Sequence, residues 1–482
     1  MKYLFSNLKT YATLSTKWLQ FCLLFCITLS LPISAEEKPA ADKGVSLQAD
    51  IEELDRRFKQ LSAKIYSDSA KKNTQQSFRF SELLELKKSV QQAVDQNDAF
   101  SAITQIHLNL QLIEDNISDP ITIELIELLL KHNEYLTAQI IFQQLKDDND
   151  ELLIARASLR LATYHSKREE WQNVIILLNI ELDELSGDDF NRVNLLTGTA
   201  LQHLRYHRKA IKIYQQISNT SADYPLAQLN IAVAHIRQDW WTDAHIVINQ
   251  LLKNEQVLKN PELENRLYLM LGYSLLSKEF VREARESFRN VSIDSQYTNK
   301  ALMGISLAAI SQNDYSGAIN ALSILKQKPL NPLVSEEANL LLPHVYKMLE
   351  QYQTANTGYT NAIDYYQSRI DQLSRAITTD KLYTIKNISL DNDSSFVIAD
   401  STFNINNYYP THFIENYVEL KKLTEQKITP QLNLEASNLF QDYANRVDRI
   451  VKALVKNRIK QLESYLSQSR YSLAKLYDNN DE

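Results

Sequence analysis

Residues 271–288 read LGYSLLSKEFVREARESF, and residues 305–322 read ISLAAISQNDYSGAINAL. Both stretches place a small residue (Gly272, Ser306) twelve positions before an alanine (Ala284, Ala318) and an aromatic residue shortly before that alanine. The same small position recurs along the chain at 102, 138, 174, 210, 244, 284, 318 and 355, with steps of 34 to 40 residues. Two helices that cross closely leave room for only small side chains at the contact. The sequence therefore predicts an all-α chain of stacked helix pairs.

The period and its flanking residues resemble the tetratricopeptide repeat (TPR) family, whose unit is 34 residues long. The pattern is clearest at Tyr135/Ala138/Phe142, Trp241/Ala244/Ile248, Tyr315/Ala318/Leu322 and Tyr352/Ala355/Tyr359. The resemblance covers roughly residues 85–370. It implies a right-handed superhelix of about 7–8 helix pairs, because one pair cannot bury its own apolar face. On this interpretation the aromatic positions pack in the core, including Trp171, Trp240, Trp241, Tyr315 and Tyr352.

The first 35 residues have the pattern of a signal peptide. Lys2, Lys9 and Lys17 precede an apolar run that ends near Ala35, and no acidic residue occurs before Glu36. The run is interrupted by polar residues, which favours a cleaved signal over an uncleaved inner-membrane anchor, the minor alternative. We therefore expect a periplasmic protein without a stable membrane span. Both cysteines, Cys22 and Cys26, lie in this segment, so the mature chain has no thiolate chemistry.

Composition and the absence of known motifs exclude several fold classes and functions. Only seven glycines occur in 482 residues, which leaves few tight turns for a strand-rich fold. Removing the three leader lysines changes the formal net charge from −7 to −10, and an acidic chain without a basic stripe argues against nucleic-acid binding. Gly-rich phosphate loops and metalloprotease motifs are absent from the sequence. His203 lies at the end of a predicted helix and His207 in the turn that follows it, which argues against a metal site formed by the pair. We expect no catalytic residues, no cofactor and no metal.

The segments on either side of the repeats have patterns of their own. In residues 36–77, apolar side chains step by four and three from Leu47 to Ile65, which predicts a heptad helix followed by a polar linker from residue 66. Docking as a cap on the first repeat and self-association through residues 47–65 are the two interpretations. Residues 371–482 predict a C-terminal helical region, with a long loop near 387–410, a short hairpin at Phe396 to Phe403, and one long helix from Leu432 to Tyr477.

A binding groove is predicted on the first helices of the central repeats. We assign to it the positions fifteen and eleven residues before the small positions, which are apolar: Leu195, Leu229, Val233, Leu269, Tyr273, Met303 and Leu307. Such a surface would be a liability if it were open. We therefore expect it to be filled, either by the protein's own C-terminal helix or by an amphipathic segment of a partner.

These observations predict a periplasmic TPR scaffold that mediates protein–protein interactions in a cell-envelope assembly. The residue pattern does not identify the partner, because a repeat fold alone does not determine function. The alternative is an envelope enzyme that acts on peptidoglycan and carries its activity in residues 371–482, at the end of a helical solenoid.

Overall fold

The computed structural model of the chain describes residues 41–72, 78–148, 150–179, 185, 187–327, 332–378, 395–399, 401–404 and 411–478. It contains two compact units. The N-terminal unit is Ala35–Ala234 together with Tyr409–Val447, and the C-terminal unit is His235–Tyr408 together with Asp448–Glu482. The predicted signal peptide lies outside the described residues. Among the described residues, no helix is both long enough and apolar enough to cross a membrane.

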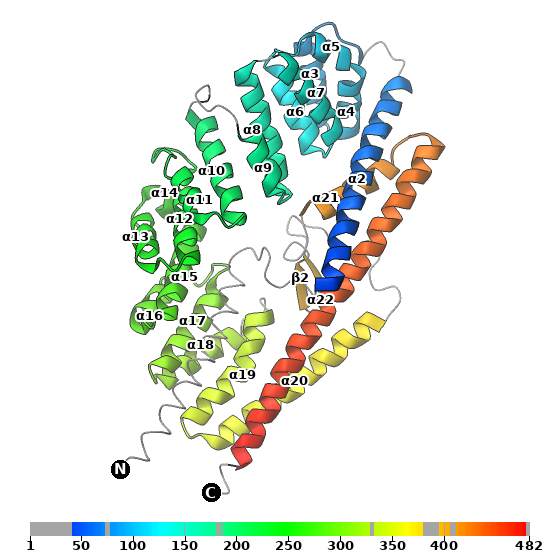
Figure 1. Cartoon of the computed structure of the whole chain (residues 1–482). Helices are drawn as coiled ribbons and strands as arrows, with labels where there is room; N and C mark the ends of the chain where they lie inside the picture. Colours follow the sequence, from blue (N-terminus) through cyan, green and yellow to red (C-terminus); the bar gives the residue numbers. More distant parts are fainter. Residues whose placement is uncertain are drawn as a thin grey trace. The chain divides into compact units, whose positions relative to one another are not determined.

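Eight helix pairs, each a helix A followed by a helix B, form the repeats (Figure 1). They are α3/α4 (Leu83–Asp95, Ala99–Leu108), α6/α7 (Ile121–Lys131, Tyr135–Asp148), α8/α9 (Glu151–Lys167, Trp171–Leu177), α10/α11 (Gly187–His203, His207–Tyr214), α12/α13 (Tyr224–Arg237, Trp241–Leu251), α15/α16 (Pro261–Ser277, Val281–Arg289), α17/α18 (Thr298–Ser311, Tyr315–Gln327) and α19/α20 (Pro332–Met348, Tyr352–Thr378). Short helices α5 (Leu110–Asp115) and α14 (Glu255–Leu258) follow two of the B helices. The predicted all-α repeat architecture is confirmed.

The small position of every repeat is fully buried. Ala102, Ala138, Val174, Ala210, Ala244, Ala284, Ala318 and Ala355 each expose 0% of their surface. Each lies in the first turns of a B helix, where the helix passes close to helix A of the same pair. A larger side chain there would push the two helices apart, which explains the recurrence of alanine.

The turn between helices A and B has the same backbone in all eight repeats. The residue five positions before the small position has a positive φ, between 58° and 67°, and is never glycine: Asn97, Asn133, Glu169, Arg205, Asp239, Glu279, Asn313 and Glu350. The next residue donates its N–H to a carbonyl five positions back, as Phe280 does to Leu275. This is the bond pattern of a Schellman motif, which ends a helix with one left-handed residue. The chain therefore builds its turns despite its few glycines.

We expect Glu279→Gly to stabilise the C-terminal unit by about 0.5–1 kcal/mol, because glycine adopts a positive φ without a Cβ clash. Glu286→Gly, at an exposed position in the middle of α16, should instead destabilise the unit by about 1 kcal/mol. Urea denaturation of the two variants measures both effects. Equal destabilisation by the two changes would contradict this assignment of the turn.

Phe288 is the central side chain of the largest core described in the C-terminal unit. It is 0% exposed and lies edge-on to Tyr273, with ring centroids 4.8 Å apart. A Cβ built on Gly272 would come within 2.5 Å of its ring, and one built on Gly304 within 2.4 Å. The ring therefore fits between helix A of its own repeat and helix A of the next one. Gly198 is in contact with Tyr214 in the same way in the N-terminal unit.

The aromatic residues at the A–B turns are less buried than predicted. Trp171, Trp240, Trp241 and Tyr315 are half-buried, and Tyr352 is 40% exposed. The prediction of core packing is therefore wrong for Tyr352 and only partly met by the others. The physical reason is their position at the edge of the array, where a neighbouring side chain covers one ring face. His203 stacks on Trp171 at 4.0 Å between ring centroids, and Lys278 lies 4.6 Å from the Trp241 ring.

The N-terminal heptad helix is α2 (Ala41–Lys72), and it docks on its own chain. Its seam residues Ile51, Phe58 and Ile65 are 2%, 1% and 0% exposed. In the N-terminal unit α2 contacts α4, α7 and α21. The cap interpretation is therefore confirmed, and these side chains are already covered within the chain. The helix also continues through the predicted linker as far as Lys72, because Tyr66 and Ala70 are buried too.

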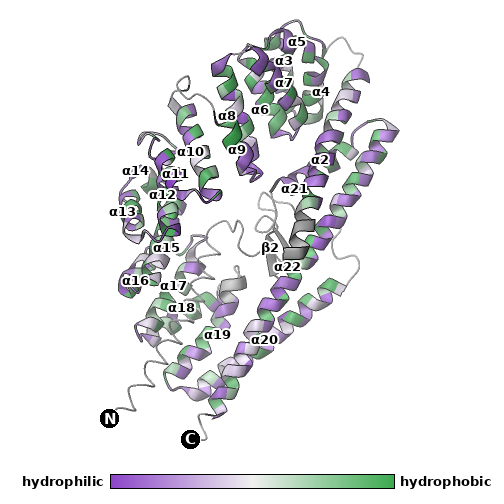
Figure 2. Ribbon diagram, viewed as in Figure 1, coloured by the Kyte–Doolittle hydropathy of each residue, from purple (hydrophilic) through white to green (hydrophobic). Residues whose placement is uncertain are grey.

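The C-terminal region contains the predicted hairpin and the predicted long helix. Strands β1 (Ser395–Ile398) and β2 (Ser401–Asn404) are antiparallel, with Phe396 opposite Phe403. Helix α21 (Thr411–Thr424) precedes α22 (Pro430–Asp478), which Figure 2 shows as polar and apolar residues alternating along its length. Residues up to Val447 of α22 belong to the N-terminal unit and the later ones to the C-terminal unit. The rest of the predicted 387–410 loop lies outside the described residues.

Candidate functional site

Helix α8 of the N-terminal unit leaves one row of side chains uncovered. This row is Arg156, Arg160, Thr163 and Lys167, which are half-buried or exposed. Their spacing of four, three and four residues places them on one face of the helix. The residues between them, from Ala157 to Leu159 and at Leu161 and Ala162, are buried. The uncovered face of α8 is therefore basic.

Ion pairs connect neighbouring A helices of the N-terminal unit. Lys87 of α3 pairs with Glu124 of α6 at 2.7 Å, and Glu127 of α6 pairs with Arg160 of α8 at 2.7 Å. The series continues as Arg156–Asp189 at 3.6 Å and Arg192–Asp223 at 3.1 Å. We call these eight residues the charged ladder. Each pair is partly exposed and contributes little stability, so the charges of both signs remain available to a partner.

The C-terminal unit differs from the N-terminal unit at one position of this row. Fourteen positions before the small residue, where α6 and α8 have Glu124 and Arg160, the A helices α15, α17 and α19 have Met270, Gly304 and Leu341. Eighteen positions before it, where α8 and α10 have Arg156 and Arg192, they have Arg266, Lys300 and Glu337. Both units are therefore charged at the second position, and only the N-terminal unit is charged at the first.

The structure places all seven predicted groove residues inside the repeats. Their exposed fractions are 3% for Leu195, 0% for Leu229, 7% for Val233, 1% for Leu269, 4% for Tyr273, 1% for Met303 and 5% for Leu307. Leu269, Tyr273, Met303 and Leu307 belong to the core around Phe288. The side chain fifteen positions before the small residue faces this core, and its neighbour at fourteen lies one helical step, about 100°, further round. A partner could not reach the seven side chains as they lie, and binding through them stays a prediction.

The C-terminal helix packs elsewhere than on those seven positions. In the N-terminal unit the first part of α22 pairs with α2, through Arg57–Asp442 at 2.8 Å and Lys64–Glu435 at 2.9 Å (Figure 1). In the C-terminal unit its last part packs on α19 and α20, where Leu340, Tyr359 and Leu476 share a core. Filling of a central groove by α22 likewise stays a prediction.

A buried polar cluster, which we call the Asp55 cluster, joins four elements of the N-terminal unit. The Asp55 carboxylate of α2 accepts hydrogen bonds from the Arg168 guanidinium, from Lys59 Nζ at 2.8 Å and from Asn416 Nδ2 of α21 at 2.7 Å. Arg168 Nε donates to Glu170 Oε1 at 3.1 Å in the turn between α8 and α9. Further members are His165, bonded to Glu170, His412 of α21, and Tyr443 of α22, which lies 3.4 Å from Asn416.

Burial and mutual charge set the protonation of this cluster. Burial by itself would raise the pKa of the Asp55 carboxyl, but Arg168 and Lys59 outweigh it and hold that pKa below its usual value. The pKa of Glu170 is lowered well below its usual range because the contacts with His165 and Arg168 outweigh burial. Burial, together with the charge of Arg168, lowers the pKa of His412 to about 4. At neutral pH the cluster therefore holds ionised carboxylates, the Arg168 cation and a neutral His412.

The C-terminal unit has a smaller counterpart on the same long helix. Arg458 of α22 forms an ion pair with Glu336 of α19, and both side chains are almost fully buried. Tyr365 donates its hydroxyl to Glu336 at 3.2 Å. Burial raises the pKa of Glu336 even though Arg458 opposes the shift. Sequence inspection missed both clusters, because their partners lie 113 and 122 residues apart.

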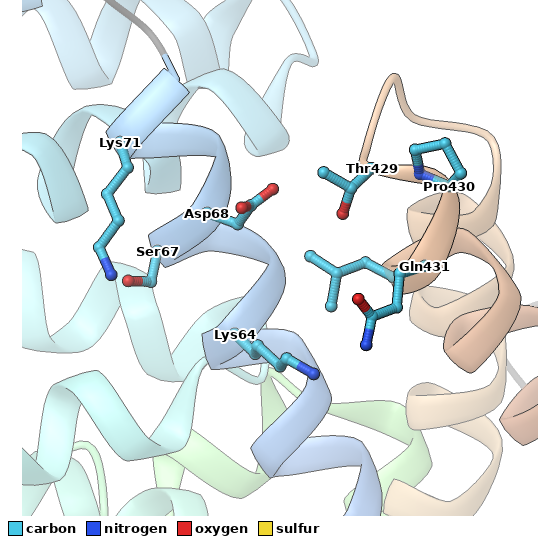
Figure 3. Close-up of a pocket in the computed structure, with 8 residues that line it drawn as sticks. Lys64, Ser67, Asp68, Lys71, Thr429, Pro430 and Gln431 are labelled. Atoms are coloured by element: carbon cyan, nitrogen blue, oxygen red, sulfur yellow. The ribbon is translucent and has the colours of Figure 1, made fainter.

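The described residues contain no group of three or more His, Cys, Asp or Glu side chains that could hold a metal ion. One pocket of about 540 Å³ lies between α2 and the start of α22, where Lys64 and Asp68 face Thr429 and Gln431 (Figure 3). Lys64 is already paired with Glu435 and Asp68 with Lys72. The pocket is therefore a polar gap between two docked helices, and it has no set of groups converging on a ligand.

Helix pairs with a common buried position and a common turn define this chain as a TPR-like helical repeat protein. No family model matches the sequence, and the search of curated proteins found no match. Among solved structures, the apo form of RapI is 12% identical, covers 77% of this chain and 99% of its own, and has a TM-score of 0.42. The apo form of the quorum sensor NprR from B. thuringiensis is 13% identical, covers 70% of this chain and 99% of its own, and has a TM-score of 0.33. With such scores, the fold assignment depends on the helix pairs themselves.

Proposed function

We propose that this protein is a non-enzymatic scaffold of the cell envelope that holds a protein partner on the A-helix face of its N-terminal unit. The charged ladder is the observation that supports this proposal most directly. It extends over α3, α6, α8 and α10, and α6 and α8 each end in a further exposed cation, Lys131 and Lys167. Repeat arrays bind partners along such extended faces. The partner segment would carry charges of both signs with an excess of acidic residues.

The enzyme alternative has less support from the described residues. Three carboxylates of α21 and α22 are engaged in ion pairs: Glu435 with Lys64, Asp442 with Arg57, and Glu419 with Lys422. These pairs connect helices or neighbouring turns. A peptidoglycan-degradation assay on the mature chain tests the alternative, and clear turnover would overturn the scaffold proposal.

Export is the second part of this proposal, and it is supported by the pattern of the first 35 residues. We expect fractionation to recover the protein from the periplasm, with a mature N-terminus near Glu36. A cytoplasmic product that starts at Met1 would contradict export. The interaction face is tested separately by the crosslinking experiment below.

Reversing two charges of the ladder, Arg156→Glu with Arg160→Glu, should reduce partner binding at least tenfold, because like charges then face the partner's acidic residues. The measurement is photo-crosslinking in the native envelope from a probe at Thr163, which lies on the same face as both arginines. Raising the ionic strength should weaken wild-type binding as well.

The matched control is Lys209→Glu with Lys212→Glu on helix α11, which changes the net charge equally on a B helix. It should leave the Thr163 crosslink intact. A crosslink that survives charge reversal on α8, or that is lost equally in the control, would show that the charged ladder is not the interaction face.

A further inference from the structure

The Asp55 cluster contains one neutral base among fixed charges. His412 begins the buried face of α21 and is 6% exposed. Its Nδ1 makes no hydrogen bond within the described residues, and neither does Arg168 Nη1. The next residues on the same helix, Phe413, Tyr417 and Leu420, are 1%, 2% and 0% exposed. Docking of α21 therefore combines an apolar face with one polar end.

The charges around His412 come from each element packed against it. Helix α2 contributes Asp55 and Lys59, and the turn between α8 and α9 contributes Arg168 and Glu170. Helix α21 itself adds Asn416, and α22 adds the Tyr443 hydroxyl. His165 is bonded to Glu170 and so satisfies part of that carboxylate. Both carboxylates already have cationic or imidazole partners, so they offset only part of the cost of charging the buried ring beside Arg168 and Lys59.

We propose that His412 makes the docking of α21 on α2 acid-sensitive, because protonation of its buried ring adds a cation beside Arg168 and Lys59 and releases α21. Release would expose the apolar face formed by Phe413, Tyr417 and Leu420. This pH-dependent docking takes place within the N-terminal unit and does not depend on the charged ladder or on its partner.

The direction of the pH effect follows from proton uptake. The pKa of His412 is about 4 when α21 is docked, below the ordinary value of 6.5, so the undocked state binds the proton more tightly. Docking is at full strength above about pH 6.5 and weakens as the pH falls toward 4. With one proton taken up, the undocking equilibrium constant rises by at most about tenfold for each pH unit in that window.

The test uses the mature full chain, in which residues 36–482 contain no cysteine. Single cysteines introduced by Gln60→Cys on α2 and Glu415→Cys on α21 accept spin labels at exposed positions. We expect one short, narrow distance distribution at pH 7 and a longer, broader one at pH 4.5. In the His412→Gln variant, which cannot be protonated, the distribution at pH 4.5 should remain that of pH 7.

His344→Gln is the matched control, because His344 is a half-buried histidine of the C-terminal unit whose pKa is also lowered by burial. In this variant the distance distribution between the two labels should broaden at pH 4.5 as it does in the wild type. Circular dichroism at pH 7 verifies that the variants fold, and if His412→Gln does not, His412→Asn takes its place. Equal broadening in wild type and the His412 variant, or an unchanged wild-type distance at pH 4.5, would overturn the proposal.

Discussion

Arg168→Ala is expected to lower the free energy of unfolding of the N-terminal unit by about 3–5 kcal/mol, because it leaves the Asp55 charge buried with only part of its compensation. The arginine is 3% exposed, and its guanidinium bonds both Asp55 and Glu170. Loss of one partner of a buried pair costs far more than the pair itself contributes. Urea denaturation, combined with hydrogen exchange in α2 and α21, measures the loss and shows where it occurs.

Two further variants make this expectation specific. Asp55→Leu together with Arg168→Met should recover at least about 2 kcal/mol of the loss, because no unpaired charge is then buried. Arg57→Ala removes the exposed pair with Asp442 and should cost less than about 1 kcal/mol. If the double variant is no more stable than Arg168→Ala alone, the buried charge is not the cause of the destabilisation.

Phe288→Ala is expected to destabilise the C-terminal unit by about 3–5 kcal/mol, since it removes a fully buried ring and leaves a cavity between two repeats. The ring fills the space that Gly272 and Gly304 leave open. Chemical denaturation gives the magnitude, and hydrogen exchange in α15 and α17 locates it.

The two glycines supply the control for this prediction. In the wild type, Gly272→Ala should cost about 1–3 kcal/mol through overpacking against the ring. In the Phe288→Ala background the same change should be neutral or stabilising, because the added methyl enters the cavity and alanine favours a helix by about 1 kcal/mol. Simple addition of the two losses would show that the ring and the glycine do not share one space.

The local residue pattern was sufficient to predict the repeats. Eight small positions could be read from the sequence because each helix pair needs a close crossing near its turn, and all eight are fully buried. Heptad spacing revealed α2, and an unbroken amphipathic stretch revealed α22. The left-handed turn residue also had a signal that we did not use: a polar residue stands five positions before each small one.

The candidate sites were harder to predict for a physical reason. We chose the groove residues by counting back from the small positions, and the count fell on the core side of the A helices. A shift of one residue rotates a helix by about 100°. On α6 and α8 it leads from the core position fifteen before the small residue to Glu124 and Arg160 of the charged ladder, whereas from Leu269 and Met303 it leads to Met270 and Gly304. A choice between adjacent positions requires knowing which helices cover each side.

The sequence by itself determined the repeat period, the helix pairs, the closely packed small residues and the amphipathic flanking helices, because each depends on spacing within some forty residues. Only the tertiary structure decided that Asp55 meets Arg168 and Asn416, that Glu336 meets Arg458, and that ion pairs connect the A helices of the N-terminal unit. The contacts of Asp55 and Glu336 join residues more than 100 positions apart. Their energy comes from burial, which the sequence around each residue does not reveal.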